Sequence, residues 1–218
     1  MRIDHCEFPD DLLYDVANGT WGRPEPGALK VGITSLLSWA SGIFSTVSFK
    51  DVGTVLERGQ VAGSVEGPTH FDVVRMPVSG TISKTNEALI DEPKLLNKDP
   101  YGLGWFMDVR LCEPKELSLL QRIPGDEPLI AARIHELRVR CFAEFPDHQM
   151  FEVGIECSAI LVKLNELLYR SPSATVVHVV SDDSTAPIEM VRWSDQTGNK
   201  VVESRKEGNL YHFIAKKA

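Results

Sequence analysis

The chain has 218 residues, of which 43% are hydrophobic and 25% are charged, and its formal net charge is −8. This composition is ordinary for a soluble globular protein with one large domain or two small ones. The acidic balance and the lack of a basic patch argue against a nucleic-acid partner. No apolar run approaches the roughly 20 residues that a membrane span needs. The acidic N-terminus lacks the apolar core of a signal peptide, so we expect a cytoplasmic protein.

Residues 29–111 have the pattern of an all-β unit. Val, Ile, Phe and Thr dominate the candidate strands, and Gly or Pro separates them. The expected strands are 29–34, 43–49, 61–67, 71–76, 80–85 and 105–111. Between the first two, residues 35–42 predict a short helix that Gly42 ends. The long segment 86–104 is expected to be functional or to cover the core.

The pattern changes to helix beyond residue 112. The run 113–123 predicts a short helix, and "IPGDEP" predicts a break. In the run 129–145, Ile130, Ile134, Leu137 and Cys141 recur at helical spacing, so they share one face. We therefore expect a linking helix within residues 123–147.

Residues 148–218 alternate between strand and helix patterns. Strand-like "HQMFEVGIE" precedes helical "CSAILVKLNELLYR", apolar "ATVVHVVS", helical "TAPIEMVRWSDQTG" and a hairpin around Gly208. The order β-α-β-α-β-β predicts a two-layer sandwich with two helices on one face of a four-stranded sheet.

Several ordered motifs in residues 12–122 resemble the H protein of the glycine cleavage system. They are "VGIT" (31–34), "VGTVLERGQ" (52–60), "GSVE" (63–66), "PVSG" (77–80), "NEAL" (86–89), "DEPKLLNKDPYGLGW" (91–105) and "CEPKELSLL" (112–120). The resemblance implies an α+β chain that begins with a lipoyl-domain-like β barrel-sandwich hybrid over residues 1–122. In that family a lysine after Glu-Ser-Val, at a hairpin tip, carries the lipoyl cofactor. Here Thr69 follows Glu66-Gly67-Pro68, and the nearest lysines are Lys50 and Lys84. We therefore expect no lipoyl group and no other cofactor.

Residues 148–218 resemble the TusA/SirA-type sulfur carriers. The family's reactive cysteine, in a Cys-Pro-x-Pro motif at a helix start, corresponds to Cys157. The run "VVSDDSTAPIEMVRW" resembles the family's second strand, Asp-Asp loop and second helix. Ser158 and Ile160 replace the two prolines that normally rigidify the first helical turn.

Cys157 is the candidate catalytic residue, and it would carry a persulfide. A helix N-terminus favours a thiolate, whereas the neighbouring Glu156 and Glu152 raise a thiol pKa. The alternative is a buried cysteine that packs as a small hydrophobe. All four cysteines are expected to be reduced, with Cys141 in a core and no context for Cys6 or Cys112. No CxxC pair occurs, so zinc is not expected, and His5-Cys6 alone makes no metal site.

The other candidates each have a structural alternative. Asp182-Asp183 could bind a cation or cap the second helix, and capping is the expectation. His70 at the hairpin tip is either a new functional group or an exposed turn residue, and His178 is expected to be a strand histidine. Three tryptophans are expected to anchor cores: Trp39, Trp105 and Trp193.

Two functions remain open. In the first, the protein relays sulfur from a donor such as a cysteine desulfurase to an acceptor, and the H-like domain docks on a lipoyl-handling enzyme. In the second, both domains are degenerate, and the protein is a non-catalytic adaptor whose domains act only as binding surfaces. A third function, activity as a glycine cleavage H protein, is excluded by Thr69.

Overall fold

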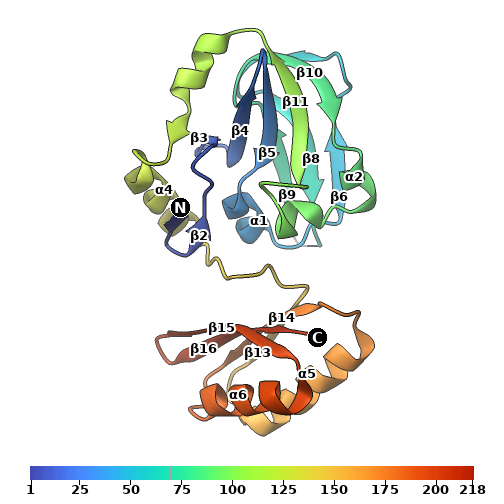
Figure 1. The fold of residues 1–218 in the computed structure, drawn as a ribbon, viewed down its shortest axis with the longest axis vertical. Coiled ribbons are helices and arrows are strands. Elements are labelled where there is room, and N and C mark those ends of the chain that lie inside the picture. The colour runs from blue at the N-terminus through green and yellow to red at the C-terminus, as the bar shows by residue number, and fades with distance from the viewer. Residues whose placement is uncertain (69) are drawn as a thin grey trace. The chain divides into compact units, whose positions relative to one another are not determined.

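The computed structural model describes residues 1–68 and 70–218, and the chain divides into two compact units, Met1–Cys141 and Phe142–Ala218 (Figure 1). The first unit is mainly β-structure. Its strands are β1 (Arg2–Ile3), β2 (Cys6–Glu7), β3 (Leu13–Asp15), β4 (Thr20–Glu25), β5 (Ala28–Ile33), β6 (Thr46–Phe49), β7 (Val55–Leu56), β8 (Val61–Glu66), β9 (Phe71–Arg75), β10 (Gly80–Thr85), β11 (Trp105–Leu111) and β12 (Gln121–Arg122). Its helices are α1 (Ser35–Ser41), α2 (Ala88–Asp91), α3 (Leu95–Lys98), the 3₁₀ helix η1 (Pro114–Leu119) and α4 (Glu127–Leu137).

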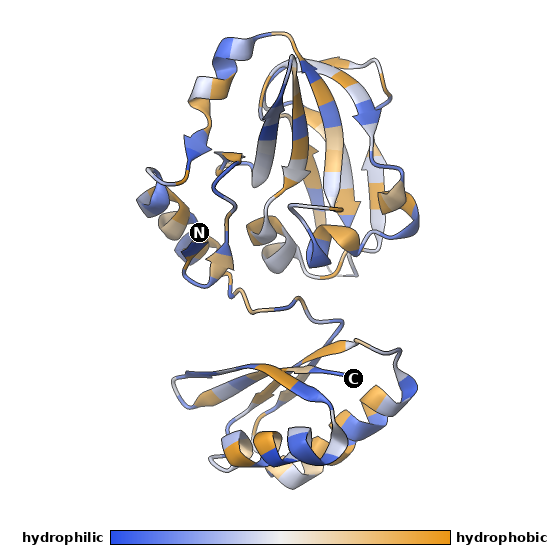
Figure 2. Ribbon diagram, in the orientation of Figure 1, coloured by the Kyte–Doolittle hydropathy of each residue, from blue (hydrophilic) through white to orange (hydrophobic). Residues whose placement is uncertain are grey.

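Two antiparallel sheets enclose the main core of the first unit. Within the described residues, one sheet has the order β12-β3-β4-β5-β11-β10-β7 and the other has the order β6-β8-β9. Alternate residues of facing strands, such as Val31 of β5 and Val65 of β8, lie in one buried cluster. Hydrophobic and hydrophilic residues alternate along these strands in Figure 2, as expected for strands with one face on a core.

The long segment 86–104 serves as a cover. Its short helices α2 and α3 place Leu89 and Leu96, both fully buried, against the main core. The expectation of a covering segment is therefore confirmed. The expected helix 113–123 is instead the 3₁₀ helix η1 followed by β12, because Pro114 starts a tight turn and Leu120 is already extended.

A second cluster of the first unit joins the N-terminal arm to α4. Ile3, Phe8 and Ile130 are among its buried members. Helix α4 ends at Leu137 because Arg138 takes a left-handed conformation as its C-cap. Cys141 therefore lies beyond the helix, and the prediction that Cys141 shares a helical face with Ile130, Ile134 and Leu137 is wrong.

Cys141 forms a disulfide with Cys6, with a Cα–Cα distance of 5.0 Å. The expectation that all four cysteines are reduced is thus wrong for this pair, and the free cysteines are Cys112 and Cys157. The disulfide ties the N-terminal arm, through β2, to the segment that follows α4. It closes the cluster that these two chain segments share.

The second unit contains one mixed sheet and two helices. Its elements are β13 (His148–Glu152), α5 (Cys157–Arg170), β14 (Val176–Ser181), α6 (Ala186–Thr197), β15 (Lys200–Glu207) and β16 (Leu210–Lys216). The sheet order is β13-β14-β16-β15, with β13 parallel to β14 and the other pairs antiparallel. Both helices contribute to one buried cluster with Val177 and Val179 of β14, so they cover the same face of the sheet (Figure 1). Among the described residues, no helix is both long enough and apolar enough to cross a membrane.

Candidate functional site

The hairpin of β8 and β9 contains the turn at which the H-like resemblance predicts a modified side chain. Glu66 lies opposite Phe71 at its end, and the Gly67 N–H donates to the His70 carbonyl oxygen at 2.8 Å. His70 is exposed, as expected for a turn residue. Thr69, which we expect at the position of the family's lysine, lies outside the described residues.

The base of this tip packs tightly against the chain at residues 43–45. A Cβ atom on Gly67 would lie 2.4 Å from the Ile43 carbonyl oxygen, which is far inside van der Waals contact. The Ser45 N–H also donates to the Glu66 carbonyl oxygen at 2.7 Å. Only glycine fits position 67 without a shift, because it has no Cβ.

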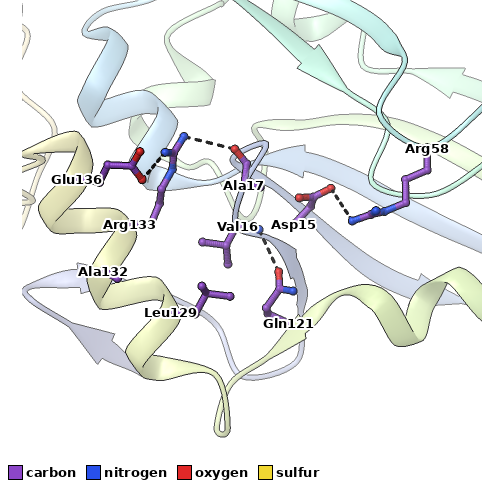
Figure 3. Close-up of a pocket in the computed structure, with 9 residues that line it drawn as sticks. All are labelled: Asp15, Val16, Ala17, Arg58, Gln121, Leu129, Ala132, Arg133 and Glu136. Atoms are coloured by element: carbon purple, nitrogen blue, oxygen red, sulfur yellow. Dashed lines mark hydrogen bonds and ion pairs between the residues drawn. The ribbon is translucent and has the colours of Figure 1, made fainter.

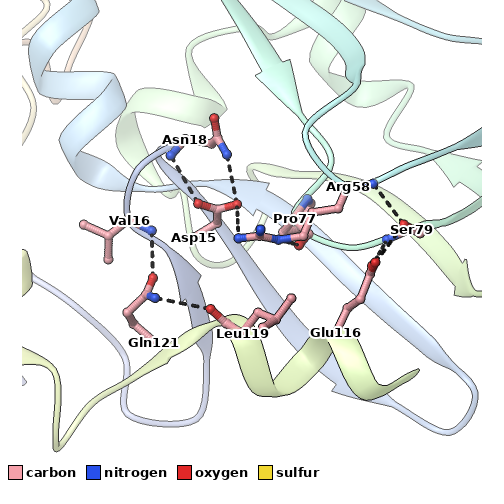
Figure 4. A network of polar contacts seen from close by, with 9 residues as sticks. All are labelled: Asp15, Val16, Asn18, Arg58, Pro77, Ser79, Glu116, Leu119 and Gln121. Carbon is pink, nitrogen blue, oxygen red and sulfur yellow. Dashed lines mark hydrogen bonds and ion pairs between the residues drawn. The ribbon is translucent and has the colours of Figure 1, made fainter. Parts of the chain in front are cut away.

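A polar network surrounds Asp15 at the end of β3 (Figure 4). The Asp15 carboxylate is 3% exposed and accepts hydrogen bonds from the Asn18 side chain at 3.0 Å and from Arg58 Nη2 at 3.4 Å. Arg58 Nε donates to the Pro77 carbonyl oxygen at 3.0 Å, and the Arg58 N–H donates to Ser79 Oγ at 3.0 Å. Arg58 therefore satisfies a buried carboxylate and links β3 to the segment before β10.

The same network extends to η1. The Ser79 N–H and hydroxyl donate to the Glu116 carboxylate at 2.6 and 3.1 Å. On the other side of β3, the Val16 N–H donates to Gln121 Oε1 at 3.2 Å. These bonds fix the 3₁₀ segment η1 against the sheet and hold β12 beside β3.

A pocket of about 340 Å³ lies beside this network, with one wall formed by α4 (Figure 3). Arg133 Nη1 binds the Glu136 carboxylate at 2.7 Å, and Arg133 Nη2 donates to the Ala17 carbonyl oxygen at 3.4 Å. The remaining lining residues are Asp15, Val16, Arg58, Gln121, Leu129 and Ala132. The pocket combines apolar side chains with two arginines that already bind carboxylates. Such a lining can bind a partner or a small molecule.

Cys157 is the first residue of α5, as the sequence predicts, but its side chain is not accessible. The residue is 2% exposed and belongs to the buried cluster beneath the sheet. Burial, together with the negative charges of Asp183 and Glu189, raises the pKa of the Cys157 thiol to about 11. At neutral pH only about one molecule in 10⁴ would therefore hold the thiolate.

Asp183 is the residue that organises this end of the second unit. Its Oδ2 accepts the Cys157 N–H at 2.7 Å, and its Oδ1 accepts the Thr185 N–H at 2.8 Å. These hydrogen bonds to the carboxylate lower the pKa of Asp183. Asp183 thus binds the first N–H of α5 and also the N–H of Thr185, directly before α6, where the sequence predicts a cap. Asp182 Oδ1 accepts the Gly154 N–H at 2.8 Å, and the described residues contain no cluster that could hold a metal ion.

The other candidates have structural surroundings. His178 is 6% exposed on β14, and its Nε2 lies 3.0 Å from Nδ1 of His212. Trp193 is 3% exposed and donates to Asn165 Oδ1 at 2.7 Å, so its expected core role is confirmed. Trp39 and Trp105 pack on the second cluster of the first unit.

Sequence reasoning missed Asp15, Arg58 and Arg133. Arg58 lies within the motif 52–60, but nothing in the motif identifies a partner that is 43 residues away in the chain. Asp15 carries a weak signal, since a carboxylate three residues before Asn18 is typical of a turn.

The comparisons with known proteins bear on the first unit. The family model described as "Glycine cleavage H-protein" matches residues 12–125. The chain belongs to this family. A "Probable glycine cleavage system H protein 2" of Sulfurisphaera tokodaii is 35% identical over 122 residues, which cover 55% of this chain and 82% of that protein. "Glycine cleavage system H protein 5" of Aquifex aeolicus is 30% identical over 145 residues, 64% of this chain and 98% of that protein.

Among solved structures, a glycine cleavage system H protein from Mycobacterium marinum is 30% identical and has a TM-score of 0.45. It covers 51% of this chain, and 98% of that protein is matched. The family match over residues 12–125 lies within the first unit, Met1–Cys141. The arm that precedes residue 12, helix α4 and the whole second unit lie outside the family match.

Proposed function

We propose that the protein is a non-catalytic adaptor whose H-like domain docks on an enzyme that handles H proteins without carrying a lipoyl group itself. Residues 51–83 contain no lysine, so the hairpin has no amine for the amide bond to lipoate. Lys84 lies within β10, and its Nζ is 5.4 Å from the centre of the Trp105 ring. In this proposal Thr69 replaces the family's lysine, and its hydroxyl cannot form the same linkage.

The burial of Cys157 is the observation that favours the adaptor function over the sulfur-relay function. A persulfide carrier needs a thiolate that a donor and an acceptor can both reach. Here the thiol is 2% exposed, and its pKa is raised to about 11. The second domain, which we propose to be a TusA-like fold over residues 148–218, then serves as a binding surface. Residues 1–122 form the H-like domain in this proposal, and residues 123–147 link the two.

A sulfur relay is the second candidate, because Cys157 stands at the first position of a 14-residue helix. A helix N-terminus stabilises a nearby anion. In the relay, the Cys157 thiolate attacks the outer sulfur of a donor persulfide, and the donor thiolate leaves. The new persulfide then transfers its outer sulfur to a nucleophilic acceptor. This route requires an opening of the α5 N-terminus that exposes the thiol.

Competition for docking tests the adaptor. A lipoylated H protein of the same organism is turned over by its partner enzyme while the purified chain is added in increasing amounts. The proposal predicts competitive inhibition by the unmodified chain, with a raised KM for the H protein and an unchanged kcat. Unchanged kinetics at a large excess of the chain would contradict it. Cys157→Ala should inhibit equally, because the adaptor does not use the thiol.

A further inference from the structure

The two edges of the sheet in the second unit are built differently. Edge strands offer unpaired backbone N–H and C=O groups to other strands, and proteins usually block them with charge, proline or a bulge. Edge strand β15 has such features. It carries Lys200, Arg205 and Lys206, and its register with β16 shifts between Val201 and Glu203. Self-association through β15 is therefore disfavoured.

The opposite edge, β13, has no such cluster of basic residues and no bulge. Its sequence from His148 to Glu152 contains no lysine, arginine or proline, and its register with β14 is continuous. Phe151 is 65% exposed, and Val153, just beyond the strand, is 56% exposed. An unblocked edge with exposed apolar side chains is suited to pairing with another strand.

We propose that β13 pairs antiparallel with β13 of a second copy of this chain, with the two-fold axis at Met150. In this register His148 of each copy lies opposite Glu152 of the other, and Gln149 lies opposite Phe151. Two identical pairs would thus form, one on each side of the axis, in which His148 of one copy donates to the Glu152 carboxylate of the other. The two sheets would become one continuous sheet of eight strands.

The faces of β13 agree with this register. Met150 packs in the cluster beneath the helices, and Glu152 binds Lys163 of α5 at 2.7 Å, so both side chains lie on the helical face. Alternation places His148 on the same face as Glu152. Phe151 lies on the other face, where its ring is 6.1 Å from the His178 ring. The Phe151 residues of the two copies would be diagonal neighbours across the axis. Aromatic side chains can make contact over this diagonal distance.

The segment favours its own copy over an unrelated strand because it is self-complementary. Its ends are a histidine and a carboxylate, so antiparallel self-pairing matches them and parallel self-pairing does not. An edge that bound any extended peptide would not need this symmetry. The inference does not depend on the adaptor function, since it concerns a strand that neither candidate function uses.

The test is the mass of the full-length chain in solution, measured by sedimentation over a dilution series. The proposal predicts twice the chain mass at high concentration and dissociation on dilution. Phe151→Lys places a charge on the edge and should give a monomer. The matched control is Val191→Lys on α6, a residue that is 57% exposed, and this variant should remain dimeric. Both substitutions are at exposed positions, and circular dichroism checks that each variant is folded.

A second pair of variants tests the register. His148→Lys keeps an attractive partner for Glu152 of the other copy, whereas His148→Glu places two carboxylates opposite each other. Dimerisation of His148→Glu should be weaker than that of His148→Lys by about tenfold or more, since two cross-strand pairs change sign. A monomer at every concentration would overturn the proposal. Equal dimerisation of Phe151→Lys and Val191→Lys, or of the two His148 variants, would overturn it as well.

Discussion

Removal of the Cys6–Cys141 disulfide should destabilise the first unit and leave the second unchanged. The bond joins residues that are 135 positions apart, so its loss frees a long loop in the unfolded chain. The chain-entropy model gives about 5 kcal/mol for a loop of this length, and native disulfides typically contribute about 2–5 kcal/mol. For the 1–141 unit, a loss of about 2–5 kcal/mol corresponds to a fall of about 7–17 °C in its Tm.

Differential scanning calorimetry of the double variant Cys6→Ala, Cys141→Ala checks this value. Each single variant should lose nearly as much as the double variant, because either one removes the bond. Cys112→Ala, at an exposed free cysteine, is the control and should melt like the unmodified chain. The reasoning is refuted if the double variant melts within about 2 °C of the unmodified chain, or if the transition that moves belongs to the second unit.

Three further predictions concern single side chains. Gly67→Ala should lower the stability of the first unit by about 1–3 kcal/mol in urea unfolding, because its Cβ would contact a carbonyl oxygen; a neutral effect would contradict the packing of the tip. Asp183→Asn removes a negative charge that helps to raise the pKa of Cys157, so the midpoint of the pH–alkylation profile of that thiol should move below about 11. An unmoved midpoint would contradict the assigned cause. Arg58→Gln leaves the buried Asp15 carboxylate without its cation and should cost about 1–3 kcal/mol, whereas an unchanged unfolding midpoint would show that the pair contributes little.

The raised pKa of Cys157 also fixes the sign of a pH effect. The folded thiol keeps its proton up to about pH 11, whereas an unfolded cysteine loses it near its ordinary pKa of about 8.5. Between these values the folded state binds more protons, so its stability falls as pH rises. Cys157→Ala should flatten this part of the stability profile.

The strands of the first unit were predictable where side chains alternate and the ends carry Gly or Pro. Strands β8, β9 and β11 lie within two residues of their expected bounds. Strand β4 was missed, because Gly22, Pro24 and Glu25 in its sequence disfavour a strand. Its partner strands β3 and β5 impose the extended conformation.

Contacts between residues far apart in the chain, such as the Cys6–Cys141 disulfide, could not be predicted from the sequence. Nothing in the chain brings Cys6 to Cys141, since their approach depends on how the N-terminal arm and α4 pack on the sheet. The helix that contains α4 was expected to continue to residue 145, because apolar periodicity does not reveal that Arg138 takes a left-handed conformation. The position of Cys157 at a helix start was predictable, but its burial depends on the packing of α5 and α6.

The intact mass of the chain after exposure to both modification systems tests the central claim most directly. The purified chain is incubated with a lipoyl ligase, lipoate and ATP, and with a cysteine desulfurase and cysteine, while a lipoylated H protein and an active sulfur carrier serve as positive controls. The account predicts the mass of the unmodified, disulfide-bonded chain. A lipoyl adduct within residues 61–80, or an added sulfur that is lost in Cys157→Ala and kept in Cys112→Ala, would contradict it.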